Sequence, residues 1–294
     1  MKTISNLLKT SQSHIKIFRF NNFKHFSTKN TIETIDYAHD TRDFLNKIEE
    51  YESNLNDREK KILINEEPLD GYATEIGTDK YSKRNRDEVV AEHFKKFYFN
   101  DLTVSTIGLG TYIGPPDDIT DFYMYNAVKH CVLSGGVNLI DTAINYRYMK
   151  SERAVGKALK TLCSKYDYDR SELIICSKVG YVPEDAESGK KSHAFVQHLV
   201  EEDKISIEDI IFDDKKRPVH CMHPAYLKEQ LNFSLNNLGL NTIDVMYLHN
   251  VVESQGAVLP KENFEKRLAK AFEFMVSILF NNNSDRKRRE KITK

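Results

Sequence analysis

The sequence predicts an α/β protein in which helices cover a parallel β-sheet. Three observations lead to this class. Strand-like apolar runs alternate with helical patterns from residue 102 onward, four such pairs follow one another, and the runs are continuously apolar. Parallel strands are covered on both faces, so they lack the alternation of a strand with one wet face. We therefore expect four strand–helix units within residues 101–280.

The first two units are short and regular. The first begins with the β-branched run LTVSTIGLG, residues 102–110, followed by helical spacing over residues 120–134 and a Gly-Gly stop. The second is the strand VNLID, residues 137–141, followed by the helix SERAVGKALKTL. Ser151 is placed to cap that helix, and Glu152 favours the positive end of its dipole.

The last two units are separated by an insertion. ELIICSK, residues 172–178, predicts the third strand, and AYLKEQLNFSLNNLG predicts the third helix. IDVMYLH and FEKRLAKAFEFMVSIL predict the fourth strand and helix. The polar insertion at residues 181–222 lies at a strand end, where loops shape pockets. It could act as a lid, as a partner surface or as a solvated excursion, and its composition does not indicate a rigid pocket.

Polar side chains end three of the predicted strands: Asp141, Lys178 and His249. The carboxyl ends of parallel strands share one edge of the sheet, which is where α/β folds build their sites. One charge at such an edge could simply lead into solvent. Three at equivalent positions, with Tyr146 five residues after Asp141, indicate an active site. Tyr148, the rival tyrosine, is expected to line the mouth of the pocket.

A second cluster lies in the segment HCMHP, where His220, Cys221 and His223 could bind a metal. The sequence has no matching second cluster, and Pro224 suits the first turn of a helix. We therefore favour the start of a helix and expect no metal site. The four cysteines lack metal-site spacing and are expected to be reduced core thiols: Cys131, Cys163, Cys176 and Cys221.

The sequence resembles the aldo-keto reductase family from about Leu102 to Met275. Four motifs carry the resemblance in the family's order: IGLGTY, GVNLIDTAINY, ICSKVG and LNNLGLNTIDVMYLHN. The second motif has the family's D-x-A-x-x-Y spacing with Asp141 and Tyr146. The third contains Lys178, and the fourth contains His249.

The resemblance implies a (β/α)8 barrel that reduces an aldehyde or ketone to an alcohol with NADPH. It implies that Tyr146 donates a proton to the carbonyl oxygen and that Lys178 favours loss of this proton. Asp141 would pair with Lys178, and His249 would orient the substrate carbonyl. A general acid of this kind must release its proton near neutral pH.

The resemblance also implies cofactor contacts at the end of the first strand. Gly110 and Thr111 would contact NADPH together with Asp141. An ordinary glycine-rich turn explains Gly110 and Thr111 equally well, so both interpretations stay open.

Charge and hydropathy argue against two classes of partner. The chain has 43 Lys and Arg against 44 Asp and Glu, which gives a formal net charge of −1 and no general attraction to nucleic acid. No apolar run approaches the roughly 18–20 residues of a membrane span. The resemblance to the aldo-keto reductases, in turn, implies a small-molecule carbonyl substrate.

The remaining segments differ from the predicted sheet domain. Residues 1–32 carry basic residues and serines but no acid, and their apolar residues share one helical face. This pattern is typical of a mitochondrial transit peptide, with a disordered basic tail as the alternative. Residues 33–100 predict a charged N-terminal extension without a clear series of strands, and residues 281–294 predict a basic tail.

The length of the predicted barrel raises a further expectation. A (β/α)8 barrel takes about 200–250 residues or more, whereas four strand–helix units account for residues 101–280. We expect a barrel truncated to about four βα units, which is an incomplete form of a longer enzyme. The alternative is a catalytically inactive half-barrel, a structural or binding subunit whose barrel a protein partner completes.

Overall fold

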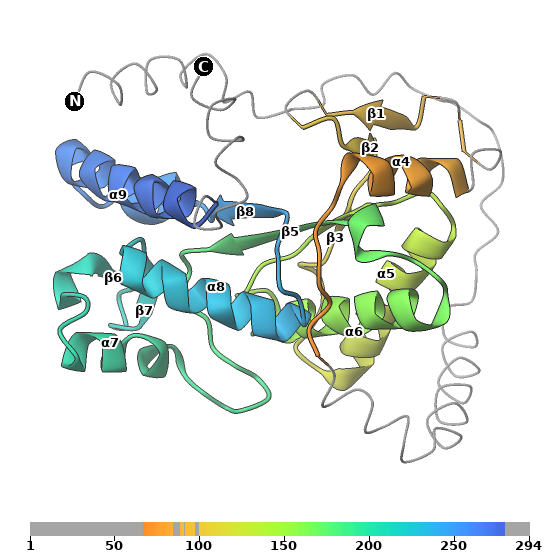
Figure 1. The fold of residues 1–294 in the computed structure, drawn as a ribbon. Coiled ribbons are helices and arrows are strands. Elements are labelled where there is room, and N and C mark those ends of the chain that lie inside the picture. The colour runs from red at the N-terminus through yellow and green to blue at the C-terminus, as the bar shows by residue number, and fades with distance from the viewer. Residues whose placement is uncertain (1–66, 85–88, 91, 98–99, 280–294) are drawn as a thin grey trace, which may run out of the picture. The chain divides into compact units, whose positions relative to one another are not determined.

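The protein is described by a computed structural model over residues 67–84, 89–90, 92–97 and 100–279 (Figure 1). These residues belong to one compact unit. The predicted transit peptide, the first half of the charged extension and the basic tail lie outside the described residues.

Four parallel strands form the central sheet, in the order β3–β4–β5–β8. They are β3 (Leu109–Gly110), β4 (Leu139–Asp141), β5 (Ile174–Val179) and β8 (Val245–Leu248). Gly110 pairs with Asp141, Asp141 with Cys176, and Lys178 with Tyr247. This register brings the carboxyl ends of the strands to one edge, and the predicted α/β class with a parallel sheet is confirmed.

A helix follows each of these strands along the chain. The helices are α5 (Asp118–Leu133), α6 (Lys150–Lys165), α8 (Pro224–Leu238) and α9 (Lys261–Leu279). In Figure 1, α5, α6 and α8 lie on one side of the sheet, and α6 packs against both of the others. Ile140 and Ile175 of the sheet are buried against Val155 and Leu159 of α6. Each such side chain contributes roughly 1.5–3 kcal/mol when fully buried.

The first predicted strand is divided between two sheets. β2 (Thr103–Ser105) pairs antiparallel with β1 (Phe94–Lys96), whereas β3 joins the central sheet. The Asn138 side chain explains the division, because its amide donates to the Thr103 carbonyl and accepts from the Ser105 N–H. These backbone groups are therefore satisfied without joining the parallel ladder.

The second half of the charged extension belongs to the same compact unit. Helix α4 (Glu75–Arg84) packs against the 3₁₀ turn η1 (Arg170–Glu172). Tyr81 of α4 is buried, and its hydroxyl lies 2.9 and 2.7 Å from the carbonyl oxygens of Val132 and Val137. This contact could not be predicted from the sequence, since polar residues dominate α4 and only one face of it is buried.

The insertion at residues 181–222 is folded. Its elements are η2 (Ser192–Phe195), α7 (Gln197–Glu201), η3 (Ile207–Asp209) and a hairpin of β6 (Ile210–Phe212) and β7 (Pro218–Cys221). Phe195, Leu199 and Ile210 are buried in one core with Met222 and Leu227. The alternative of a solvated excursion is therefore wrong, because widely spaced apolar residues of the insertion are buried in a core that it shares with α8 and α9.

Helix α6 begins differently from the prediction. Its N-cap is Met149, whose φ of 72° is left-handed, and Ser151 lies inside the first turn. The Ser151 hydroxyl donates to the Thr111 carbonyl at 2.8 Å, so the predicted cap is wrong: the hydroxyl ties the helix to the end of β3 instead. Glu152 lies in the first turn as predicted, where it is fully buried.

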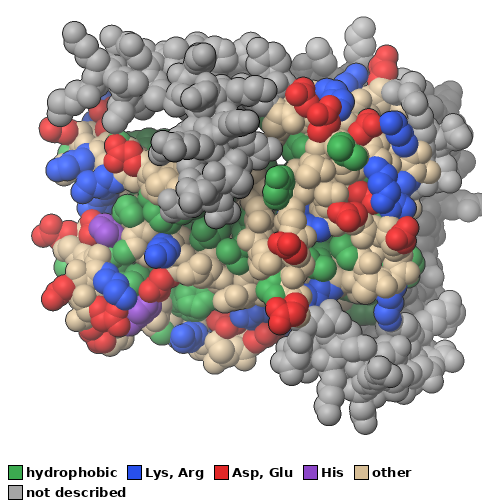
Figure 2. Space-filling view, viewed as in Figure 1, with side chains coloured by type: hydrophobic (Ala, Val, Ile, Leu, Met, Phe, Trp, Pro, Cys, Tyr) green, Lys and Arg blue, Asp and Glu red, His purple; other side chains and the backbone are tan. Residues whose placement is uncertain are grey.

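The surface is mixed in charge. On the face shown in Figure 2, Lys and Arg side chains are interspersed with Asp and Glu side chains. Within the described ranges, every helix is too short or too polar to traverse a lipid bilayer.

Candidate active site

The edge of the sheet brings the four predicted catalytic side chains together. Asp141 ends β4, Lys178 lies near the end of β5, and His249 directly follows β8. Tyr146 lies in the loop between β4 and α6. Lys178 Nζ lies 2.6 Å from Asp141 Oδ2 and 4.6 Å from the centroid of the Tyr146 ring. The ring centroids of Tyr146 and His249 are 5.7 Å apart.

The lysine at the centre of this group is held at a definite place. Lys178 Nζ also donates to the Thr142 carbonyl at 2.9 Å, and its side chain is 14% exposed. The Asp141 side chain is 35% exposed, so the ion pair is partly withdrawn from solvent. An ammonium over a tyrosine ring is worth about 0.5–2 kcal/mol, and its attraction grows when the ring carries negative charge.

The histidine of the group is uncharged at neutral pH. His249 is buried, and burial, together with the nearby Lys178 and His220, lowers its pKa to about 4. A neutral imidazole carries one N–H, so it can donate a single hydrogen bond. The Nδ1 atom is buried and has no hydrogen-bond partner among the described residues.

Tyr146, Lys178 and His249 border a cavity of about 600 Å³, whereas Asp141 is not among its lining residues. Its lining residues are Tyr112, Asn145, Tyr146, Lys178, Tyr181, Tyr247, Leu248, His249 and Asn250. Tyr112 meets the Tyr146 ring edge-on at 5.0 Å, and Tyr181 meets the His249 ring in the same way at 4.9 Å. Rigid aromatic walls with a few convergent polar groups are typical of small-molecule sites.

Sequence reasoning missed several of these lining residues. Tyr247 precedes His249 by two positions, which places both on the same side of a strand, and this signal could have identified it. Tyr181 follows Lys178 by three positions, beyond the strand, where no regular period applies. Tyr148 is 47% exposed and is not among the lining residues of this cavity.

The backbone that follows Tyr146 has an unusual conformation. Arg147, Tyr148 and Met149 have φ values of 51°, 53° and 72°, so three successive residues are left-handed. Such a conformation costs roughly 1–2 kcal/mol for each residue that has a Cβ. The segment that follows Tyr146 therefore stores strain that the surrounding structure must offset.

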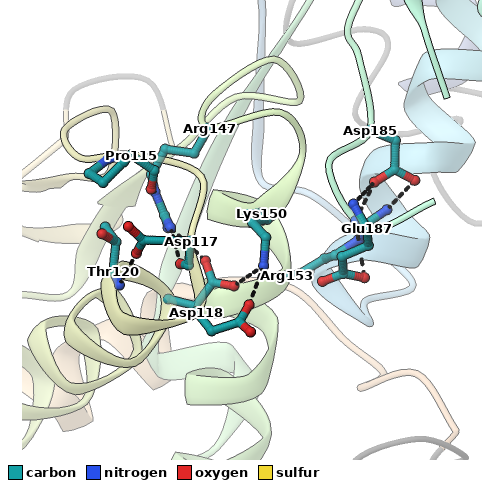
Figure 3. A network of polar contacts seen from close by, with 10 residues as sticks. Pro115, Asp117, Asp118, Thr120, Arg147, Lys150, Arg153, Asp185 and Glu187 are labelled. Atoms are coloured by element: carbon teal, nitrogen blue, oxygen red, sulfur yellow. Dashed lines mark hydrogen bonds and ion pairs between the residues drawn. The ribbon is translucent and has the colours of Figure 1, made fainter. Parts of the chain in front are cut away.

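Ion pairs with the start of α5 hold this strained segment (Figure 3). The buried Arg147 guanidinium lies 2.7 Å from Asp121 and donates to the carbonyl oxygens of Pro115 and Asp117. Lys150 lies 2.7 Å from Asp121 and 2.8 Å from Asp118. These contacts anchor both ends of the left-handed segment to one helix start.

The residues predicted to contact a cofactor differ in their exposure and in their hydrogen bonds. No atom lies within 4 Å of the position that a Cβ on Gly110 would take, so this strand end is open. Thr111 is fully buried, and both its backbone N–H and its hydroxyl donate to the Asp141 carbonyl, at 3.1 and 3.2 Å. Thr111 therefore holds the strand end that carries Asp141.

The HCMHP segment starts helix α8 as predicted. The His223 ring accepts a hydrogen bond from the Ala225 N–H at 3.3 Å, and Pro224 lies in the first turn. His220 and Cys221 are buried in β7 instead. Over the ranges that the structure describes, no three His, Cys, Asp or Glu side chains are grouped to hold a metal ion. All four cysteines are free thiols, and Cys176 and Cys221 are buried.

The fold and the site define a class: an α/β protein with a polar and aromatic pocket at the carboxyl edge of a parallel sheet. The family model "Aldo/keto reductase family" matches residues 106–275, which is more than half of the chain. The chain belongs to this family, and the resemblance seen in the sequence is confirmed.

Several known proteins are similar to part of the chain. The NADH-specific methylglyoxal reductase of Escherichia coli (strain K12) is 28% identical over 153 residues, which cover 51% of this chain and 39% of that protein. The structure of aldo-keto reductase AKR11C1 from Bacillus halodurans (holo form) has 22% identity and a TM-score of 0.34, covering 59% of this chain and 46% of that one. The aldose reductase from Schistosoma japonicum has 22% identity and a TM-score of 0.32, covering 54% and 36%. The chain thus spans less than half the length of each of these relatives.

Proposed function

We propose that the protein reduces an aldehyde or ketone to an alcohol with NADPH, and that Tyr146 donates the proton. One observation carries this proposal: Lys178 Nζ is bound to Asp141 and lies 4.6 Å over the Tyr146 ring, at the wall of a cavity of about 600 Å³. Membership of the aldo/keto reductase family supports a carbonyl oxidoreductase in general.

The proposed role of Tyr146 follows from the chemistry of a phenol. A free phenol has a pKa near 10, so its loss of a proton at neutral pH costs roughly 4 kcal/mol. The Lys178 ammonium attracts the phenolate that remains after the proton has moved to the carbonyl oxygen. Asp141 holds that ammonium against the ring, and the phenolate then regains a proton from solvent.

The proposed role of His249 is to orient the carbonyl. Its pKa of about 4 keeps the ring neutral, so the ring donates one N–H to the carbonyl oxygen without supplying a second acid. A donor placed at the oxygen where charge develops stabilises the transition state more than the ground state. Tyr146 and His249 line the same cavity, which lets both reach one oxygen atom.

A nicotinamide cofactor, when bound, supplies the hydride for the carbonyl carbon. We propose that Gly110, Thr111 and Asp141 take part in holding it. The open space at Gly110 and the 35% exposed Asp141 side chain fit this role, and Thr111 supports it through the Asp141 main chain. The Escherichia coli relative is described as NADH-specific, so NADH belongs in the same experiment.

The decisive experiment measures NADPH-dependent reduction of nitrobenzaldehyde by the purified full chain. Tyr146→Phe removes only the hydroxyl, and we expect turnover to fall by about 10²- to 10⁴-fold. Tyr148→Phe is the matched control, because Tyr148 lies outside the cavity and its loss should leave turnover unchanged. Turnover that survives Tyr146→Phe would overturn the assignment, and a parallel assay with NADH decides the cofactor.

A second function is favoured by the edge of the sheet. Among the described strands, β8 is an edge strand, and its Tyr247 is 48% exposed. In this alternative the four βα units form an inactive half of a (β/α)8 barrel, a structural or binding subunit that a protein partner completes. Light scattering after size-exclusion chromatography tests it: a stable complex without cofactor binding would favour the subunit over the enzyme.

We also propose that residues 1–32 direct the protein to mitochondria. The basic, acid-free composition of this segment supports the proposal. Import into isolated mitochondria should require residues 1–32 and should be followed by their removal. Equal import of a chain that lacks them would count against it.

A further inference from the structure

A buried histidine of the insertion contacts the main chain of His249. His220 is fully buried in β7, and its Nε2 lies 2.9 Å from the His249 carbonyl oxygen. Its Nδ1 lies 2.9 Å from the side-chain nitrogen of Gln255. A carbonyl oxygen can only accept, so Nε2 carries the proton and Nδ1 accepts from the Gln255 amide. The contacts therefore select one tautomer of His220.

We propose that His220 is a positioning residue that holds His249 in the wall of the active-site cavity. This inference rests on the proposed function, in which the His249 ring orients the substrate carbonyl. The His249 N–H donates to the Val179 carbonyl at 2.8 Å, while the His249 carbonyl accepts from His220. The backbone of His249 is thus held on one side by β5 and on the other by the insertion.

The packing around His220 also keeps this ring next to His249. The Tyr181 ring meets His220 edge-on at 5.2 Å and His249 edge-on at 4.9 Å, so it lies in contact with both rings. Gly180 has a φ of 125°, and a Cβ at this position would lie 2.6 Å from His220 Nε2. Only glycine combines this backbone conformation with the close approach of the imidazole.

The partner on the far side of His220 is also well placed. Gln255 is buried within the π-helical turn η4 (Val252–Gly256), which begins three residues after His249. Irregular turns of this kind occur often at functional sites. Burial lowers the pKa of His220 to about 4, so the ring remains a neutral bridge at physiological pH. The two hydrogen bonds that link Gln255, His220 and His249 therefore involve no charged group.

Nitrogen-15 spectra of the histidine rings test this inference without relying on turnover. His220→Phe keeps a ring but removes both hydrogen bonds, and we expect the His249 ring signals to shift and broaden. His220→Gln keeps an N–H donor that can reach the His249 carbonyl and should restore them. His223→Asn is the matched control, because it keeps the cap of α8. Unchanged His249 signals in folded His220→Phe would overturn the proposal.

A second variant covers the case in which His220→Phe fails to fold. Gln255→Leu leaves the hydrogen bond from His220 to His249 but removes the donor to Nδ1. We expect the wild-type spectrum to show His220 with its proton on Nε2, and Gln255→Leu to perturb both the His220 and the His249 signals. A His220 ring protonated on Nδ1 in the wild type, or a His249 signal unaffected by Gln255→Leu, would contradict the proposed chain.

Kinetics separate this inference from the proposed function. Small displacements of a catalytic group cost between about 10- and 100-fold in rate, and we expect kcat/KM of His220→Phe to fall in that range. His220→Gln should recover to within about twofold of the wild type. If Tyr146→Phe keeps full turnover, the proposed function fails and the spectra alone decide the role of His220. If Tyr146→Phe is inactive but folded His220→Phe is fully active, the positioning role fails.

Discussion

The two sides of the candidate site are held by different kinds of contact. The loop that carries Tyr146 is anchored by charged groups, because Arg147 and Lys150 form ion pairs with Asp121 at the start of α5. The strand end that carries His249 is anchored by neutral groups, because His220 donates to its carbonyl and accepts from a glutamine. One cavity thus depends on two sets of contacts that respond to different conditions.

The two kinds of contact predict different responses of the two sides to salt and to pH. Ion pairs near the surface weaken with salt and with protonation of their carboxylates. Buried neutral hydrogen bonds are indifferent to salt but require close packing and an uncharged imidazole. Mild acid should therefore loosen the His249 side first, and salt should act on the exposed ion pair of the Tyr146 side, between Lys150 and Asp118.

Mild acid gives the largest expected effect. The pKa values of His220 and His249 are about 4 in the folded protein, against an ordinary value of 6.5. The unfolded chain therefore binds protons first as the pH falls, so stability is present above pH 6.5 and is lost toward pH 4. We expect a loss of roughly 2–3 kcal/mol for each histidine at pH 4.5, measured by urea denaturation at several pH values.

His220→Gln is the control for this titration, because it removes one ionisable group and keeps a donor. The dependence of unfolding free energy on pH should become shallower by about one proton. Hydrogen bonds from Thr120 and Lys150 lower the pKa values of Asp117 and Asp118, so these two carboxylates stay charged to a lower pH than ordinary aspartates. Burial raises the pKa of Glu152, which opposes the trend equally in both proteins. An unchanged slope in His220→Gln would contradict a buried neutral His220.

Gly180→Ala tests the close packing of the His249 side. The new methyl group would meet His220 at 2.6 Å and would force a residue with a Cβ to a φ of 125°. Backbone strain and overpacking together should cost about 3–5 kcal/mol of unfolding free energy. Gly189→Ala is the control: Gly189 also has a positive φ, of 71°, but a Cβ at this position would have no atom within 4 Å. Equal destabilisation by the two substitutions would show that the approach of His220 is not tight.

Arg147→Ala tests the Tyr146 side. Removal of one partner of a buried ion pair costs about 3–5 kcal/mol, and here the loss should be nearer 2–3 because Lys150 still binds Asp121. The strained segment would lose its anchor, so turnover should fall together with stability. Arg217→Ala, which removes an exposed ion pair with Asp213, is the control and should leave both unchanged. Thermal unfolding and the reductase assay measure the two effects.

The sequence could predict which polar residues meet at the candidate site because these residues follow the strands. Asp141, Lys178 and His249 each end an apolar run, and register alone brings them to one edge. Tyr146 is near enough in the chain to Asp141 to share its pocket. The four strand–helix units could be predicted from the sequence as well, because buried strands and helices carry apolar residues at regular spacing.

The residues that hold the candidate site in place could not be predicted from the sequence in this way. His220 lies in a hairpin of short strands within a polar insertion, and its partners are 29 and 35 residues away in the chain. Ser151 has the composition of a helix cap, but tertiary structure draws its hydroxyl to Thr111. The left-handed backbone of Arg147 has no sequence signature, because glycine would be the usual residue there.

Salt gives the smallest expected effect and separates the two sides most cleanly. Asp118 pairs with Lys150 at 2.8 Å, but its side chain is 98% exposed. Asp118→Asn should therefore lower the unfolding free energy by no more than about 0.5 kcal/mol, and the difference from wild type should vanish in about 1 M salt. The effect of His220→Phe should be the same in low and high salt, because no ion pair is involved. If both variants responded to salt alike, the distinction between a charged and a neutral anchor would be wrong, since only exposed charges are screened.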